Sequence, residues 1–512
     1  MVSTTIALAL TVGTLALTAG LGLWYARGRI ETVEDLIAAR NSTGSGMTTA
    51  TLVASVMGVW ILLAPAEAGA AFGGIAAVAG YAVGEMLPML VYARLGPRIR
   101  DLIPEGHTLT EYALARYGPV MYGFILLVSV FYMFIFLAAE LTGITSALQL
   151  VAAVPRWQTA VLVGGFVLLY TGYGGLQASI FTDTIQTLLI LPLLVLAAIG
   201  AIFALGGTGV VHDRIVAADP SLLDPTFLTG LRFGLWVAIA IVGAELVNQT
   251  WWQRIYAAAD SRTLQRSFTV AAVANALIVF LAGLFGVIAR GYADIVTNPA
   301  RDTYNASIAF FVLLQDAFPE WITLVVTLLA LVLVMSTADT LFNALASVVT
   351  ADLPRLLADP SDRTLRVGAR SLTVLVAIGA ILVSLRAQSV LRLFLLADLL
   401  GAAVMVPLLS GLYSERIPGA GAVVAGVAGV VVGVAYFPNQ LVRAGLEAIP
   451  GLASFLPTPD FLAAFVGAAA ISTTLTFISM WIPGATFDLE VLSRRIRRLD
   501  ESATPETEGV GD

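Results

Sequence analysis

The chain has 512 residues, of which 58% are hydrophobic and 12% charged, and its mean hydropathy is +0.91. Such a composition excludes an ordinary water-soluble globular protein and predicts a polytopic membrane protein. All 27 basic residues are arginine and the acidic residues number 34, so the net charge is −7 and no basic face is available for nucleic acid. The absence of cysteine and the presence of only two histidines, both in predicted loops, exclude thiol chemistry, disulfides and a Cys/His metal site.

Thirteen apolar stretches follow one another along the chain. Each is close to the roughly 20 residues that a helix needs to cross about 30 Å of hydrocarbon. We therefore predict an all-α integral membrane protein with about 13 transmembrane helices. The predicted spans are residues 3–24, 47–68, 74–94, 119–142, 158–176, 184–206, 231–252, 267–289, 322–348, 368–386, 390–412, 419–437 and 460–482. No basic residue precedes the first stretch and it is longer than the core of a secretory signal, so we predict that it is retained as a span.

The arginines predict the orientation of the spans. With the N-terminus outside and the C-terminus in the cytoplasm, the inner segments hold 19 arginines and the outer segments hold 8. This asymmetry is what the positive-inside rule requires of a multi-pass protein of the cell membrane. The transmembrane domain then covers residues 1–482, and residues 483–512 form a partly disordered cytoplasmic tail that begins with an arginine-rich helix at 489–499.

Two of the predicted outer connections are long, at residues 207–230 and 291–321. The second contains an amphipathic pattern over residues 306–318, which predicts a short helix. Segments of this kind can cover a cavity that opens to the outside.

The second span contains two residues that interrupt helices, Gly58 and Pro65. A break frees backbone carbonyls, which a membrane tolerates only where they are buried in protein or line a site, and transporters bind ions and substrates at such discontinuities. A simple kink is the alternative, because glycine and proline are common in spanning helices. This motif alone favours neither interpretation.

The ninth span carries Ser336 and Thr337 followed by Asp339 in an otherwise apolar helix. Two adjacent hydroxyls and a carbonyl from the preceding turn can supply three of the hard oxygen ligands that sodium needs. The alternative is that both hydroxyls bond back to the carbonyls four residues earlier, the usual arrangement of Ser and Thr in spanning helices.

Residues 170–186 read YTGYGGLQASIFTDTIQ. The paired glycines Gly174 and Gly175 permit a tight turn back into the membrane, and Thr182 or Asp183 can cap the sixth span. For Asp183, capping and a role in releasing a cation to the cytoplasm stay open as alternatives. At the end of the seventh span, the aromatic residues around Arg254 are most simply an interfacial anchor.

Four of these segments resemble the sodium/solute symporter family, whose members carry proline, sugars, pantothenate, urea, iodide or short carboxylates. The segments are 108–118, 170–186, 252–260 and 335–337. The resemblance implies a LeuT-type fold with inverted five-helix repeats at about 47–206 and 231–412, one extra N-terminal helix and two extra C-terminal helices. It also implies a sodium site formed by the carbonyls of Ala54, Met57 and Leu333 and the hydroxyls of Ser336 and Thr337, with Asp183 as a sodium-release residue.

The chain also departs from well-known members of that family. The proline carriers have an aspartate immediately before the methionine of the broken helix, where this chain has Val56. Proline and sugar carriers have aromatic residues in the seventh span, where this chain has Ile241, Ala244 and Glu245. Neither substrate follows from the resemblance.

Several carboxylates fall within the predicted spans, and we expect no arginine deep enough to pair with them. These residues are Glu85, Glu140, Glu245, Asp339 and Asp398, with Glu67 near an outer end. Each costs ~2.5–3.5 kcal/mol at the centre of a spanning helix, so such residues usually mark ion or substrate paths. The alternatives are protonation, a position near the interface, or hydrogen bonds to Ser or Thr of a neighbouring helix.

We predict a secondary active transporter that carries sodium and a small organic solute across the membrane by alternating access. No catalytic constellation indicates an enzyme, and no cofactor is expected besides Na+ as the coupling ion. The expected partners are the solute, sodium and the lipid bilayer, without nucleic acid.

The carboxylate of Glu245, placed where the seventh span should unwind, favours an amino acid or another amine-bearing solute. The predicted substrate-binding residues are Val56, Gly58, Trp60, Glu245 and Asn248. The alternatives are a neutral or carboxylate solute such as urea, a sugar or a short-chain acid, and a transporter-like sensor, which the short tail disfavours.

Overall fold

The computed structural model describes residues 3–27, 39–299, 301, 303–356, 362–483 and 486–496. Within these ranges the only strand-type pairing is an isolated bridge between Thr43 and Ala258. Nine of the described helices are long and apolar enough to cross a membrane, or up to eleven if each bent pair of helices is one span. The all-α fold class is confirmed, and the number of thirteen spans stays a prediction.

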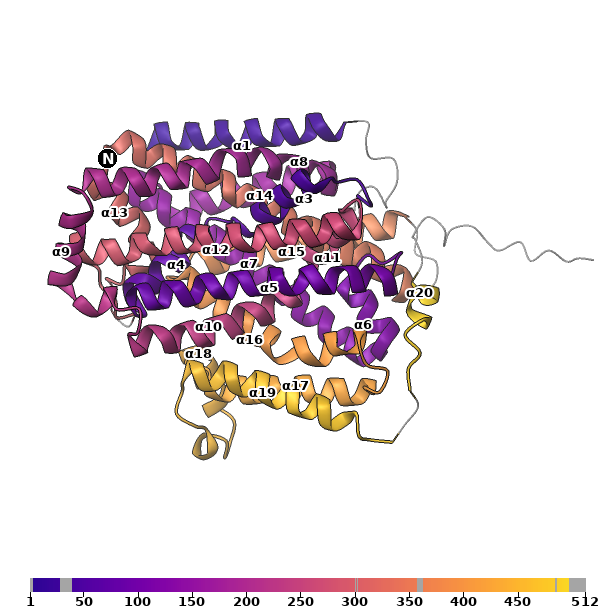
Figure 1. The fold of residues 1–512 in the computed structure, drawn as a ribbon. Helices are drawn as coiled ribbons and strands as arrows, with labels where there is room; N and C mark the ends of the chain where they lie inside the picture. The colour runs from indigo at the N-terminus through magenta and orange to yellow at the C-terminus, as the bar shows by residue number, and fades with distance from the viewer. Residues whose placement is uncertain are drawn as a thin grey trace, which may run out of the picture.

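The long helices lie side by side, with α1 at one margin of the bundle and α17 and α19 at the other (Figure 1). In chain order the long helices and the halves of broken ones are α1 (Thr4–Ala26), α3 (Ser45–Val56), α4 (Trp60–Ala71), α5 (Gly74–Leu102), α7 (Pro119–Ala152), α8 (Arg156–Ala204), α10 (Leu228–Leu246), α11 (Gln249–Ala257), α12 (Ser261–Tyr292), α14 (Glu320–Leu356), α15 (Asp362–Ser384), α16 (Val390–Leu409), α17 (Gly419–Tyr436) and α19 (Phe461–Ser479). The short α-helices are α6 (Leu109–Tyr117), α9 (Thr208–Ala218), α13 (Ala309–Ala317), α18 (Gln440–Glu447) and α20 (Val491–Arg495). The 3-10 turns are η1 (Pro220–Leu223), η2 (Ala306–Ile308), η3 (Ser410–Leu412) and η4 (Ala453–Phe455).

Large apolar side chains cover the outside of the bundle. Leu127, Leu188, Leu375 and Phe203 expose 67%, 71%, 68% and 76% of their surface. A water-soluble protein rarely leaves so many large aliphatic and aromatic groups in solvent. A hydrocarbon environment accounts for them, and the chain is a multi-pass membrane protein.

Small residues allow the central helices to approach one another closely. Gly80 on α5 faces Gly234 on α10, and Gly243 on α10 faces Gly401 on α16, so that a Cβ at any of these positions would meet the backbone of the partner helix. Lipid tails are as apolar as leucine, so helices in a membrane associate through close van der Waals packing of this kind. These two crossings hold α10 between α5 and α16, the three helices that carry the site described below.

The arginines gather at two opposite ends of the bundle, as the topology predicts. At one end Arg98, Arg100 and Arg116 donate to backbone carbonyls of Leu412, Ile255 and Gly411. At the other end Arg156 donates to the carbonyls of Ser384 and Ala387, beside the start of α8. The assignment of these ends to cytoplasm and exterior stays a prediction.

The second predicted span is broken into α3 and α4, whose axes differ by 55°, so of the two alternatives the break is the one found. The break lies at Met57, Gly58 and Val59. Pro65 lies inside α4 and does not interrupt it, so the prediction that this proline contributes to the break is wrong. The seventh predicted span is also broken, at Val247 and Asn248 between α10 and α11.

The fifth and sixth predicted spans both fall on α8, whose helical assignment is unbroken through Gly174 and Gly175. Contacts nevertheless show that α8 crosses the bundle twice. Near the start of α8, Arg156 and Gly164 contact the end of α15. Further along, the ring of Phe181 stacks on Tyr25 at the far end of α1. Near the end of α8, Gly200 lies next to the ring of Phe318 beside α13. The chain therefore reverses between residues 164 and 181, as two antiparallel spans require.

The predicted amphipathic segment 306–318 is confirmed as η2 and α13. The other outer connection forms α9, which is bent by 79° from the end of α8 and lies across one end of the bundle (Figure 1). Of the arginine-rich helix predicted at 489–499, the structure describes α20, which has five residues. Residues 497–499 lie outside the described part of the chain.

Candidate functional site

The break between α3 and α4 releases backbone carbonyls inside the bundle. In a continuous helix the carbonyls of Ala54 and Met57 would accept from the amides of Gly58 and Ile61. Those amides instead donate to Val56 O at 2.9 Å and Gly58 O at 3.2 Å. Two of the three carbonyls predicted as sodium ligands therefore have no donor from their own helix.

Glu140 on α7 stabilises the start of α4. Its carboxylate accepts from the amides of Val59 at 2.9 Å and Trp60 at 3.4 Å, and the side chain is fully buried. A carboxylate at a helix N-terminus satisfies free amides and complements the helix dipole. Gly58 is required here because a Cβ at this position would collide with Oε1 of Glu140. The sequence identified Glu140 only as an intramembrane carboxylate and did not predict this role.

The hydroxyl pair on α14 does not bond back to its own helix. Ser336 donates to Oδ1 of Asp183 at 2.5 Å. Thr337 is buried, and its Oγ1 has no hydrogen-bond partner within the described ranges. The back-bonding alternative is therefore wrong for both residues, because Ser336 donates to another helix and Thr337 makes no bond to its own helix.

Asp183 joins three helices instead of capping one. Its carboxylate accepts from Thr51 of α3 at 2.7 Å and from Ser336 of α14, and it lies 3.5 Å from Nη2 of Arg254 on α11. The capping interpretation is wrong, because the donors to both carboxylate oxygens are side chains of other helices. The proposed role in sodium release is not tested by this geometry and stays a prediction.

Arg254 is completely buried, so the expectation that it anchors the helix at the membrane interface is wrong. The sequence predicted that no arginine lies deep enough to pair with the six intramembrane carboxylates; Arg254 lies near one of them, Asp339, and no ion pair is found for the others in the described residues. Arg254 pairs with Asp183, donates to Thr340 Oγ1 at 2.9 Å and lies within coulombic range of Asp339. Asp339 in turn accepts from Ser179 at 2.6 Å. We call this cluster the inner polar junction; its members are Thr51, Ser179, Asp183, Arg254, Ser336, Asp339 and Thr340.

A second polar cluster surrounds a cavity between α4, α5, α7, α10 and α16. Three carboxylates line it: Glu85 of α5, Glu245 of α10 and Asp398 of α16. Each is at least 91% buried. In the part of the chain that the structure describes, none of the three forms an ion pair with arginine or histidine. We call this cavity the acidic chamber.

Glu245 is the best-ordered acid of the chamber because three donors hold it. Tyr132 donates to Oε1 at 2.7 Å, while Trp251 and Asn248 donate to Oε2 at 2.5 and 3.1 Å. Asn248 also caps α11 by accepting from the amide of Thr250 at 3.0 Å. The break after α10 therefore fixes the orientation of this carboxylate toward the chamber.

Aromatic rings form most of the remaining wall of the chamber. They belong to Trp60, Tyr81, Tyr132, Phe136 and Phe394. The ring of Phe394 lies edge-on to both Trp60 and Phe136, with centroids 5.6 and 4.8 Å apart. The chamber itself measures only about 20 Å³, room for a single water. It is closed in this conformation.

The predicted substrate-binding residues separate into two groups. Trp60 and Glu245 line the chamber. Val56 and Gly58 lie at the break, and Asn248 positions Glu245 without lining the chamber itself. The sequence missed the aromatic residues of α5, α7 and α16, because no spacing pattern links rings that come from three distant helices.

Another buried acid, Glu67 on α4, lies near the predicted outer end. It accepts from the hydroxyl of Ser389, whose oxygen lies 2.9 and 2.7 Å from the two carboxylate oxygens, and from the hydroxyl of Tyr304. Ser389 is the N-cap of α16, and Tyr304 belongs to the connection that precedes α13. Glu67 thus connects α4 with the start of α16 and with the segment that precedes η2.

Comparisons with known proteins agree with this arrangement. The family model described as "Sodium:solute symporter family" matches residues 36–429. The spermidine transporter DUR31 of Candida albicans is 27% identical over 375 residues, which cover 73% of this chain and 68% of that protein. The sodium/pantothenate symporter of Escherichia coli is 25% identical over 341 residues, which cover 63% of this chain and 68% of that protein.

Among solved structures, a substrate-bound, outward-open Na+-coupled sialic acid symporter superimposes with a TM-score of 0.72 at 19% sequence identity. The match covers 94% of this chain and 98% of that structure. At this identity the likeness shows the fold alone, and it confirms the predicted LeuT-type fold. The boundaries of the two repeats stay predictions.

Proposed function

Because the chain belongs to the sodium:solute symporter family, we propose that it carries an amine-bearing cation across the cell membrane together with sodium, by alternating access. The observation that carries this proposal is the acidic chamber, in which Glu85, Glu245 and Asp398 converge without an ion-paired arginine or histidine in the described chain. The three carboxylates favour a solute with more than one amino group, such as a polyamine.

The energetic argument starts from the cost of the carboxylates. Each buried carboxylate costs roughly 2.5–3.5 kcal/mol at the centre of a spanning helix, and neighbouring acids repel one another. Structural carboxylates elsewhere in this protein are satisfied one at a time, Asp183 by Arg254 and Glu140 by the amides of Val59 and Trp60, whereas the chamber brings three acids together without a counterion. A mobile cation that enters the chamber removes this cost each time it binds, which supports a cationic substrate.

The aromatic walls support the same class of solute. Ring faces attract ammonium groups, and their apolar surface suits the methylene chain that joins two amines. Trp60 is the first residue of α4, directly after the first break, and Phe394 lies in the first turns of α16, close to its N-cap Ser389. Movement of α4 or α16 would therefore open or close the wall around the solute.

Among the relatives, the spermidine transporter supports a polyamine, and the pantothenate symporter represents the alternative of a carboxylate solute. No group in the chamber favours the second alternative, because the described lining includes three acids and no basic side chain. We therefore retain the amine-bearing solute.

For sodium, we propose the carbonyls of Ala54, Met57 and Leu333 and the hydroxyls of Ser336 and Thr337 as ligands. The diverted amides at the break and the unpartnered Oγ1 of Thr337 support this site. Hard oxygen ligands of this kind suit an alkali cation. Asp183, which bonds to Ser336, would then receive or release the ion on the side of the inner polar junction.

The inside-negative membrane potential favours inward transport of a positively charged solute. With an inside-negative potential of 100 mV, each positive charge that enters gains ~2.3 kcal/mol, and a tenfold sodium gradient adds ~1.4 kcal/mol. A solute with several amines would therefore carry more inward charge than the sodium alone. The ratio of charge to sodium moved distinguishes this proposal from symport of a neutral solute.

The decisive experiment is transport into proteoliposomes with and without a sodium gradient. The panel comprises spermidine, putrescine, proline, pantothenate, urea and glucose, and sodium uptake and transported charge are recorded in parallel. We expect sodium-stimulated uptake of a polyamine, with more than one charge per sodium. Transport of only neutral or anionic compounds would refute the amine-bearing solute while leaving family membership intact.

A further inference from the structure

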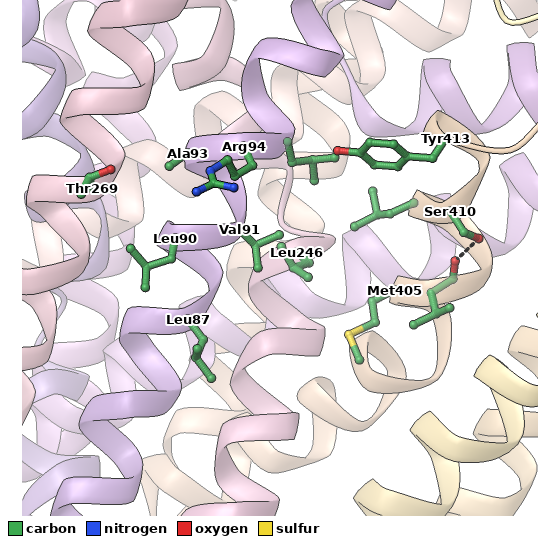
Figure 2. A pocket seen from close by; sticks show the side chains of 13 residues that line it. Leu87, Leu90, Val91, Ala93, Arg94, Leu246, Thr269, Met405, Ser410 and Tyr413 are labelled. Carbon is green, nitrogen blue, oxygen red and sulfur yellow. Dashed lines mark hydrogen bonds between the residues drawn. The ribbon is translucent and has the colours of Figure 1, made fainter.

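A wide groove opens on the outside of the bundle between α5, α10 and α16. It measures about 730 Å³, far larger than the acidic chamber, and α5 and α16 supply most of its lining (Figure 2). Leu87, Leu90 and Val91 each expose 36–39% of their surface along it. These aliphatic side chains face the lipid and line the groove.

The groove is polar at one end only. Figure 2 shows Arg94 and Tyr413 at the same level, with Leu87 and Met405 at the opposite end of the furrow. Arg94 is exposed, and the described chain offers it no hydrogen-bond or ion-pair partner. It also lies at the end of the bundle where Arg98 and Arg100 gather.

Two further cations stand close to this end of the groove. Arg98, one helical turn beyond Arg94, lies 5.8 Å from the ring of Tyr413 and donates to Leu412 O at 3.2 Å. Arg266 is exposed one turn before Thr269, the α12 residue that lines the groove. The rim is thus positively charged, and the floor is hydrocarbon.

We propose that this groove binds an anionic phospholipid, with the phosphate at Arg94 and one acyl chain along Leu87, Val91 and Met405. A guanidinium recognises phosphate through strong charge-assisted hydrogen bonds, and basic residues at the membrane surface attract anionic lipid head groups. The arrangement of a cationic rim above an aliphatic furrow matches the two halves of such a lipid. A soluble phosphate compound would leave the furrow empty.

The position of Leu246 connects this site with transport. Leu246 lines the groove and is the last residue of α10, directly after Glu245 of the acidic chamber. The break at Val247 and Asn248 follows at once. An acyl chain in the groove therefore packs against the point at which α10 and α11 must move relative to each other, and the lipid sets the rate of that movement.

The binding test uses the full-length purified protein and native mass spectrometry with dioleoyl phosphatidylglycerol and dioleoyl phosphatidylcholine. We expect the wild type to retain phosphatidylglycerol at least tenfold better than phosphatidylcholine. Arg94→Gln should remove this preference, and Leu90→Trp, which fills the furrow, should lower retention of both lipids. Arg232→Gln is the matched control, because Arg232 is an exposed arginine whose carboxylate partner, Asp460, lies far from the groove.

Glycerol 1-phosphate distinguishes a lipid from a soluble phosphate as the occupant. Failure of this compound to displace phosphatidylglycerol supports the lipid, whereas equal displacement would overturn it. Unchanged phosphatidylglycerol retention in both Arg94→Gln and Leu90→Trp would also overturn the proposal. Arg94→Lys, which keeps the charge, should retain the preference and shows whether loss in Arg94→Gln reflects misfolding.

The transport test compares uptake in liposomes with and without phosphatidylglycerol. The wild type should transport at least threefold faster with the anionic lipid, and Arg94→Gln should not respond to it. Equal rates for the wild type in both lipids would overturn the link between the groove and the break. The sodium dependence at fixed lipid composition is expected to stay the same in Arg94→Gln, because Arg94 touches neither the chamber nor the inner polar junction.

Discussion

The acidic chamber and the inner polar junction are both clusters of buried carboxylates, yet they are built in opposite ways. In the junction, Asp183 has a fixed cation, Arg254, and two hydroxyl donors. In the chamber, Glu245 has three donors but no cation, and no ion pair is found for Glu85 or Asp398 in the described part of the chain. The comparison teaches that the acid with a protein counterion holds helices together, whereas the three acids that converge on one cavity without a counterion leave their charge to a ligand.

The largest expected effect is the loss of the ion pair in the junction. Arg254→Gln leaves the Asp183 carboxylate buried without its cation, and breaking a buried pair costs about 3–5 kcal/mol. We expect loss of folded protein, measured by size-exclusion chromatography and thermal unfolding in detergent. Arg232→Gln breaks an exposed pair at 3.5 Å and should cost less than ~1 kcal/mol.

A double variant tests whether charge, not packing, is responsible. Arg254→Gln combined with Asp183→Asn removes both charges and should recover most of the lost thermal stability, although not transport. If the double variant is as unstable as Arg254→Gln alone, the ion pair is not what stabilises the junction.

The acids of the chamber should respond in the opposite way. Glu85→Gln and Asp398→Asn remove charges that have no protein counterion, so thermal stability should rise or stay the same. The concentration of polyamine for half-maximal uptake should increase by about 10- to 100-fold for each, which corresponds to ~1.4–2.8 kcal/mol of lost attraction. Uptake is measured with a labelled polyamine over a range of concentrations.

Asp316→Asn, an exposed acid of α13, is the matched control for charge removal and should change neither property. Two results would contradict the difference that we infer between the acidic chamber and the inner polar junction. One is a chamber variant that unfolds like Arg254→Gln, and the other is full polyamine affinity without Glu85 and Asp398.

The proposed sodium site shares Ser336 with the junction and sharpens the comparison. Ser336→Ala combined with Thr337→Ala removes two proposed ligands, and neither hydroxyl completes the hydrogen bonds of its own helix. We expect the sodium concentration for half-maximal uptake to rise about tenfold, or ~1.4 kcal/mol, with normal folding and insertion. Sodium dependence of uptake is the measurement.

Thr337→Ala alone separates the two explanations for such a change. Ser336 also bonds to Asp183, whereas Thr337 has no partner in the described chain. An altered sodium dependence in Thr337→Ala therefore reports ligand loss and not a disturbed junction. If the sodium dependence of uptake is unchanged in both variants, neither hydroxyl is a sodium ligand.

The all-α class could be predicted because hydrophobic length is a local signal. Each predicted span corresponds to a described helix, to part of one or to a broken pair of helices, and Gly58 marked the break that the structure has. Pro65 misled, because a proline inside α4 removes a single backbone hydrogen bond, the one its amide would make to the carbonyl of Ile61, and the helix continues through it.

The pairing of buried groups could not be predicted in the same way. Arg254 follows two tryptophans at the end of a span, a pattern that fits an interfacial anchor, and only the fold places Asp183 against it from α8. The chamber rings come from α4, α5, α7 and α16, which are distant in sequence. Intramembrane carboxylates were visible from the sequence, but the partners that decide their roles depend on tertiary packing.

The smallest expected effect concerns Glu67, which resembles the junction in its hydroxyl donors and joins α4 to α16 and to the segment that precedes η2. Tyr304→Phe removes one donor to Glu67 and leaves the Ser389 hydroxyl in place. Because one hydrogen bond contributes about 0.5–1.5 kcal/mol, the outward-open population should rise by roughly 2- to 10-fold. The chain has no cysteine, so a single Ala244→Cys in the chamber wall reports this opening through its rate of labelling by a membrane-impermeant thiol reagent. Tyr292→Phe is the matched control, since that hydroxyl donates to Leu205 O away from α4. Equal labelling rates in Tyr304→Phe and Tyr292→Phe would mean that Glu67 fixes α4 statically, as Asp183 fixes α8, and does not take part in opening.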